Sequence, residues 1–150
     1  MDLIQHAREL YTTGRMHDAL QAAQAACDRA PKDSEAWSLL GRISRHTGLP
    51  AASDEAFRRA SQLDRRRALP HRVNAGRFRE LVQEAGGPPE VRVQPMPTES
   101  QVRAGVDPDA LTYRDPAAHD ALVLFQVNHE NRSASEDELK ALIGRSLARE

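Results

Sequence analysis

Apolar and small residues in the first part of the chain recur three and four positions apart, which is the spacing of one face of an α-helix. The pattern breaks near Gly14 and Gly48, and a Pro-containing stretch separates the two halves of this region. We therefore predict four amphipathic helices. Their expected ranges are residues 2–13, 17–30, 34–46 and 51–64.

The four helices form two copies of one unit. An offset of 34 residues aligns residues of similar kind, among them Gly14 with Gly48, Ala26 with Ala60 and Leu3 with Trp37. Glycines recur where the chain turns, and small residues recur where two helices approach each other closely. Each unit is thus expected to be a helix, a tight turn at glycine, and a second helix.

This repeat resembles the tetratricopeptide repeat family. The second unit reads SEAWSLLGRISRHTGLPAASDEAFRRASQLD, and its residues at the signature places are Trp37, Leu40, Gly41, Gly48, Phe57 and Ala60. The first unit matches through Gly14, Ala19, Ala26 and Pro31. The resemblance covers residues 1–67 and departs from the family at Asp64-Arg65, where a proline is usual.

The resemblance implies a groove formed by the first helix of each unit. The residues that would face it are Ile4, Arg8, Tyr11, Ser38, Arg42, Arg45 and His46. Guanidinium groups pair well with carboxylates, so this set fits an acidic or C-terminal peptide segment as partner. The alternative is that these are exposed polar residues on a two-repeat spacer, because about three repeats are normally needed for a stable, extended surface.

After residue 68 the pattern changes. Residues 72–85 have helical spacing and could cap the two hairpins, and Val91 and Val93 alternate with polar neighbours as in a short edge strand. Residues 98–120 are rich in turn signals, whereas the apolar run 121–128 is the strongest strand candidate. Two strands alone rarely form a stable sheet. We therefore expect residues 68–150 to be an incomplete α+β domain that follows a mainly α first half.

The last predicted helix begins at the acidic cap following Ser135. Its apolar residues are Leu139, Leu142, Ile143 and Leu147, and the preceding chain offers little that would cover them. Three stretches resemble the small bacterial zincin-like metallopeptidases: FRELVQEAGGPPEVRVQPMP, DPDALTY and ALVLFQVNHENRSASEDELKALIGRSLARE. This second resemblance covers residues 72–150.

A zincin needs HExxH on a helix, with two histidines that bind zinc and a glutamate that acts as general base. The resemblance places Arg149 at the first histidine and Glu150 at the glutamate, and arginine is no zinc ligand because it stays protonated. A partial motif at His129-Glu130 has Ser133 at the second histidine position, and we expect it to be a surface turn. No catalytic residue, metal ligand or cofactor is predicted for the chain as given, and zinc only if the chain continues.

Composition narrows the class of partner. The chain is 39% hydrophobic and 29% charged with a net charge of -1, which gives no reason to expect nucleic acid or an anionic membrane as partner. The basic run at residues 65–67 has no interleaved aromatic residue. The single cysteine, Cys27, is expected to be a small buried thiol, and a reducing compartment fits it. With no signal peptide or membrane span in the sequence, we expect a cytoplasmic protein.

The leading expectation is a non-enzymatic interaction protein: a tetratricopeptide-type module at residues 1–67, fused to an inactive, truncated zincin-like segment. One alternative is a fragment of a zinc metallopeptidase whose HExxH helix continues beyond residue 150. Another is a degenerate product that folds poorly over residues 86–150.

Overall fold

The computed structural model describes residues 2–149, which are mainly helical. These residues contain eight α-helices, a short 3-10 helix and a small mixed sheet of three strands, and 59% of the chain is helical. Contacts divide the chain into two compact units. The helical unit contains the chain through Leu69 together with Thr98–Pro108, and the mixed unit contains Pro70–Pro97 and the chain from Asp109 onward.

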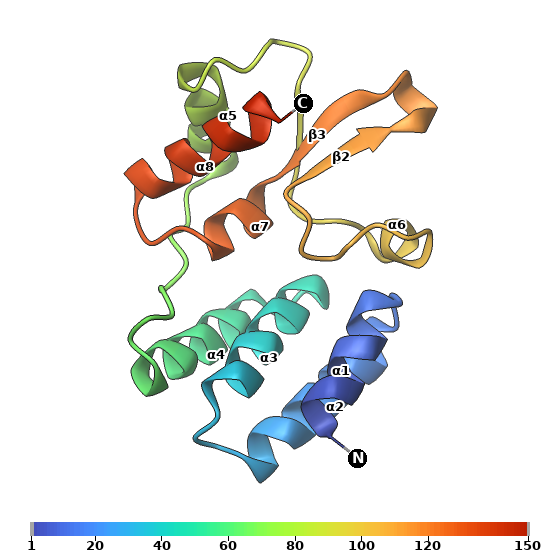
Figure 1. Ribbon diagram of the computed structural model, residues 1–150, viewed down its shortest axis with the longest axis vertical. Helices are drawn as coiled ribbons and strands as arrows, with labels where there is room; N and C mark the ends of the chain where they lie inside the picture. The colour runs from blue at the N-terminus through green and yellow to red at the C-terminus, as the bar shows by residue number, and fades with distance from the viewer. Residues whose placement is uncertain (1, 150) are drawn as a thin grey trace. The chain divides into compact units, whose positions relative to one another are not determined.

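The helical unit is built from four successive helices, each packed against the next (Figure 1). They are α1 (Leu3–Thr12), α2 (Met16–Arg29), α3 (Ser34–His46) and α4 (Pro50–Leu63). The four predicted helices are confirmed, with ends that differ by one residue at most. Their starts follow from local chemistry, because the carboxylates of Asp2 and Asp33 accept bonds from first-turn amides of α1 and α3. Pro50 occupies the first turn of α4.

Glycine makes both tight turns of the helical unit possible. Gly14 and Gly48, which join α1 to α2 and α3 to α4, have φ values of 81° and 77°. Residues other than glycine rarely adopt this left-handed backbone conformation. Between α3 and α4, a Cβ on Gly41 would meet the Phe57 ring at 3.0 Å, so these two helices approach as closely as a glycine permits.

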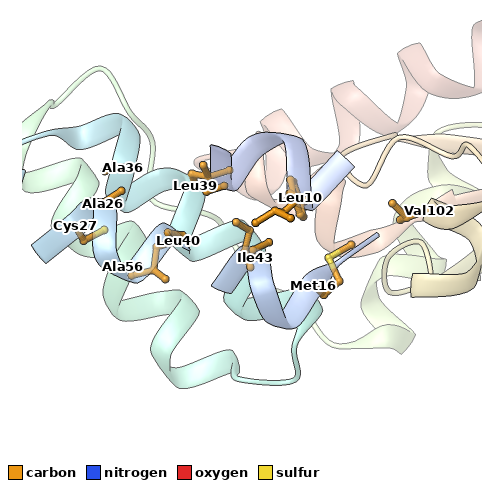
Figure 2. Packing of buried hydrophobic residues seen from close by; sticks show 14 residues of the cluster. Leu10, Met16, Ala26, Cys27, Ala36, Leu39, Leu40, Ile43, Ala56 and Val102 are labelled. Carbon is orange, nitrogen blue, oxygen red and sulfur yellow. The ribbon is translucent and has the colours of Figure 1, made fainter. Parts of the chain in front are cut away.

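The helical unit also contains a segment from the second half of the sequence. Residues 98–120 were expected to be irregular, but Thr98 and Gln101 form a capping box that starts a short helix, α6 (Glu99–Arg103). Val102 on this helix is 2% exposed and joins the core of the helical unit. Figure 2 shows Val102 at one end of that core, with Leu10 and Met16 toward the same end.

The mixed unit surrounds a three-stranded sheet. Its strands are β1 (Arg92–Gln94), β2 (Thr112–Asp115) and β3 (Ala121–Phe125), and its helices are α5 (Ala75–Glu84), η1 (Pro116–Ala118), α7 (Gln126–Asn131) and α8 (Glu136–Ala148). The strand order is β1-β3-β2, with β3 parallel to β1 and antiparallel to β2. The central strand is the most apolar, as the sequence indicated.

Two predictions about this sheet were wrong. There are three strands in the described residues, because β2 pairs with β3 along its whole length, from Thr112 opposite Leu124 to Asp115 opposite Ala121. The expected strand 121–128 ends at Phe125, and the chain continues directly into α7. A strand as short as β2 has little pattern of its own, and its neighbour decides its conformation.

The helices of the mixed unit also differ from expectation. Residues 72–85 were predicted to be a helix that could cap the hairpins; α5 packs against α8 and contributes Phe78 and Leu81 to a second core. The prediction that the apolar face of α8 lacks a core was therefore wrong. Leu139 and Ile143 are both fully buried in this cluster, together with Leu124 of β3. Among residues 2–149, no helix is long and apolar enough to cross a membrane.

Candidate peptide-binding surface

The predicted groove residues lie on α1 and α3, and these two helices contact each other in the helical unit. Arg8 on α1 donates a hydrogen bond to Glu35 on α3, and both side chains are about two-fifths exposed. This ion pair ties the two helices together across the face. The pairing of Glu35 with Arg8 is a feature that the sequence did not reveal.

Tyr11 belongs to the core and not to the open surface, which corrects its predicted place in the groove. Its side chain is 1% exposed and meets the ring of His46 edge to face, with ring centroids 5.2 Å apart. His46 in turn has its Nε2 atom 3.1 Å from the carbonyl oxygen of Pro108. The space that a neighbouring helix leaves decides which aromatic side chain turns inward, and the resemblance alone could not predict it.

Three of the remaining predicted residues share one face of α3. Ser38, Arg42 and Arg45 follow one another at helical spacing and are all half-buried. Ile4 on α1 is also half-buried and packs against the core cluster. The structure therefore brings two arginines and a serine together on α3, with Arg8 joined to the same helix through Glu35.

A second surface of the helical unit was not predicted from the sequence. It is an apolar groove of about 610 Å³ between α2, α3 and α4. Leu20, Trp37, Leu40 and Leu49 supply most of its apolar lining, and Leu49 is 44% exposed. Arg59 lies over the Trp37 ring, 5.3 Å from the centroid. The one sequence signal that could have indicated this groove is an apolar residue in a turn, Leu49 directly before Pro50.

His129 and Glu130 lie in the interior of the mixed unit, so the expectation of a surface turn was wrong. They belong to α7, and their exposed fractions are 0% and 1%. The Nδ1 atom of His129 is 2.7 Å from the Phe125 carbonyl oxygen, and Nε2 is 2.8 Å from Ser146 Oγ. Since a carbonyl only accepts, Nδ1 carries the proton and Nε2 accepts from the Ser146 hydroxyl.

The carboxylate of Glu130 is also bonded to protein groups. It accepts hydrogen bonds from Arg72 Nη1 at 3.2 Å, from the backbone amide of Val73 at 3.0 Å and from Gln126 Nε2 at 3.1 Å. These bonds hold the segment before α5 against α7. Buried polar groups need such partners, and the sequence pattern after β3 did not indicate that these two residues turn inward.

Burial shifts the pKa values of two side chains, His129 and Cys27. Burial lowers the pKa of His129 to about 4, with a smaller contribution in the same direction from Arg132, while the bond to the Phe125 carbonyl opposes the shift. Burial also raises the pKa of Cys27 to about 12, and Asp28 and Asp33 add to this effect. The predicted buried thiol is therefore confirmed. Within residues 2–149, no group of three or more His, Cys, Asp or Glu side chains could hold a metal ion.

Comparisons of this chain with protein-family models, with curated proteins and with solved structures find no match.

Proposed function

We propose that the helical unit is a tetratricopeptide-type interaction module that binds an acidic peptide segment on α3. The observation that carries this proposal is the arrangement of Ser38, Arg42 and Arg45 on one half-buried face of that helix. Half-burial holds an arginine side chain near one orientation while leaving part of it accessible to a ligand. Two guanidinium groups on one face offer several donors to carboxylates of an extended segment.

The Arg8–Glu35 pair defines how far the binding surface extends. The carboxylate of Glu35 is already bound to Arg8 on this face. A carboxylate of the partner would make the same kind of ion pair. A partly exposed ion pair contributes about 1 kcal/mol or less, because water competes for both groups. A partner carboxylate can therefore share Arg8 at small cost, and binding should weaken as salt is added.

The mixed unit is proposed to be a zincin-like segment without a metal site. In support of this, the His129 ring is bonded on both nitrogens and the Glu130 carboxylate on both oxygens, all to protein groups. A zinc ligand or general base needs at least one of these atoms exposed to metal or water. We assign both residues a structural role.

The competing proposal is a zinc metallopeptidase, and the resemblance of the stretch from Ala121 through α8 to that family favours it. The two proposals differ in metal content. We expect protein purified in the presence of zinc and then dialysed to retain less than stoichiometric metal. Stoichiometric zinc measured by atomic emission, or peptide hydrolysis abolished by a chelator, would establish the competing proposal.

The binding proposal is tested by charge reversal. The probe is a short fluorescein-labelled peptide rich in glutamate with a free terminal carboxylate, titrated against the full chain by fluorescence anisotropy. Replacing Arg42→Glu together with Arg45→Glu should weaken binding about a hundredfold, which corresponds to about 1.4 kcal/mol for each arginine. The matched control, Arg79→Glu with Arg145→Glu, makes the same change in net charge on exposed positions of the mixed unit. Equal losses in both double variants would refute the assigned site.

A further inference from the structure

The segment Thr98–Pro108 is bound to the helical unit as a ligand would be. Val102 inserts its side chain into the core of that unit. Beside it, Arg103 donates a hydrogen bond from Nε to the carbonyl oxygen of Gly14, over a distance of 3.2 Å. The contact at Gly14 is close: a Cβ there would lie 2.6 Å from Arg103 Cγ, 3.1 Å from its amide nitrogen and 3.3 Å from the Glu99 carbonyl oxygen.

The other end of the segment binds α3. The Pro108 carbonyl oxygen lies 3.1 Å from His46 Nε2, at the end of the helix that presents Arg42 and Arg45. Between the two contacts the chain turns at Gly105, which has a φ of 110°, and the amide of Val106 donates to the Gln101 carbonyl oxygen. The segment is therefore a helical turn that contacts the helical unit at both ends.

Two side chains of this segment are buried, and most of its helix is exposed. Val102 and Pro108 are buried, whereas most of α6, including Glu99, Ser100 and Arg103, is exposed. Burying a single valine shifts an equilibrium by a factor of about ten to a hundred. Because most of the segment is exposed, it can open locally without unfolding the four helices.

We propose that the α1–α2 turn and the C-terminal end of α3 form a docking site for a short helical turn, and that Thr98–Pro108 is its resident, releasable occupant. A competing partner needs the same chemistry: a β-branched apolar anchor inside one helical turn, and a backbone carbonyl several residues later that accepts from His46. This inference extends the proposed function, because the occupant contacts α3 next to the arginine face. The resident segment then regulates access to that end of the face.

The two turn glycines provide a matched test of docking. Gly14 and Gly48 have nearly the same φ, so replacement by alanine strains both turns equally. A Cβ at Gly48 meets nothing within 4 Å, whereas a Cβ at Gly14 collides with the docked segment. We expect amide hydrogen exchange at Val102 and Val106 to accelerate about tenfold or more in Gly14→Ala and to stay unchanged in Gly48→Ala. Equal exchange in the two variants would overturn the docking site.

A trans-binding experiment tests whether the occupant is releasable. The probe is a fluorescent peptide of residues 97–109, added to the full chain. Val102→Asp should release the resident segment and leave the surface intact, so the peptide should bind this variant at least tenfold more tightly than the wild type. Ser100→Asp makes the same charge change at an exposed position and should behave like the wild type. Adding Gly14→Ala to Val102→Asp should abolish binding.

Two outcomes of the peptide-binding experiment contradict a releasable occupant. Equal binding to wild type and Val102→Asp, or binding to neither, would overturn the proposal. Val102→Ala provides a milder variant whose binding should be intermediate, and it keeps the test valid if aspartate disturbs the core. The glutamate-rich probe and the arginine variants report the proposed function separately, because neither Gly14 nor Val102 belongs to the arginine face.

Discussion

The buried histidine of the mixed unit makes stability depend on pH in a way that can be calculated. In the folded protein, His129 is neutral with a pKa of about 4, while its ordinary value is 6.5. As pH falls below 6.5, the unfolded chain binds a proton that the folded chain excludes. The stabilising contribution is therefore fully present above pH 6.5 and is lost progressively as pH falls toward 4.

The size of this effect follows from the two pKa values. Each unit of difference corresponds to about 1.4 kcal/mol, so the complete loss is about 3 kcal/mol. Between about pH 7 and pH 5, the free energy of unfolding should fall by about 2 kcal/mol, or roughly twentyfold in the unfolding equilibrium.

Native-state hydrogen exchange measures this fall within each unit. Protection of β3 and α8 amides, corrected for the intrinsic exchange rate, should decrease between about pH 7 and pH 5, and helical-unit amides provide the internal reference. His129→Gln should be less stable at pH 7 and should lose most of the pH dependence. The control His119→Gln, at an exposed position of the same unit, should retain it. A wild-type slope that persists in His129→Gln would refute the reasoning.

Three further predictions concern other parts of the fold. Cys27, with its pKa raised to about 12 by burial, should react with iodoacetamide only through unfolding, and rapid alkylation of native protein would contradict its burial. Gly41→Ala should destabilise the helical unit by about 1–3 kcal/mol because a Cβ meets the Phe57 ring at 3.0 Å. Urea unfolding followed through Trp37 fluorescence measures this loss, and an unchanged midpoint would show that the helices separate freely. Ser135→Ala should destabilise α8 by about 1 kcal/mol by removing its N-cap, which exchange of the α8 amides would detect. Unchanged protection would mean that packing alone starts this helix.

Secondary structure could be predicted from the sequence wherever an apolar pattern repeats or a helix has a specific capping residue. The four helices of the first half follow from apolar spacing, from the two glycines that must turn with positive φ, and from caps such as Asp33. The apolar run that became β3 was equally clear. These signals depend on residues close together in the chain, so they survive without knowledge of the tertiary structure.

The candidate site was only partly predictable. The family resemblance assigned Ser38, Arg42 and Arg45 to one groove, and the helical period places all three on one face of α3. Tyr11 was assigned to the same surface, but it is packed into the core against His46. The direction in which an aromatic side chain points depends on what the neighbouring helix leaves unfilled, and a single helix contains no such information.

The sequence by itself determined the four helices of the first half, the central strand and the start of most helices. Only the tertiary structure decided the roles of short and ambiguous segments: β2 is a strand because β3 pairs with it, Val102 is a core residue because α6 docks beside Gly14, and His129 is buried because α7 follows β3 directly. Each of these segments is too short to have a preference that outweighs its surroundings. Long-range packing therefore fixed their conformation, whereas periodicity and turn chemistry fixed the rest.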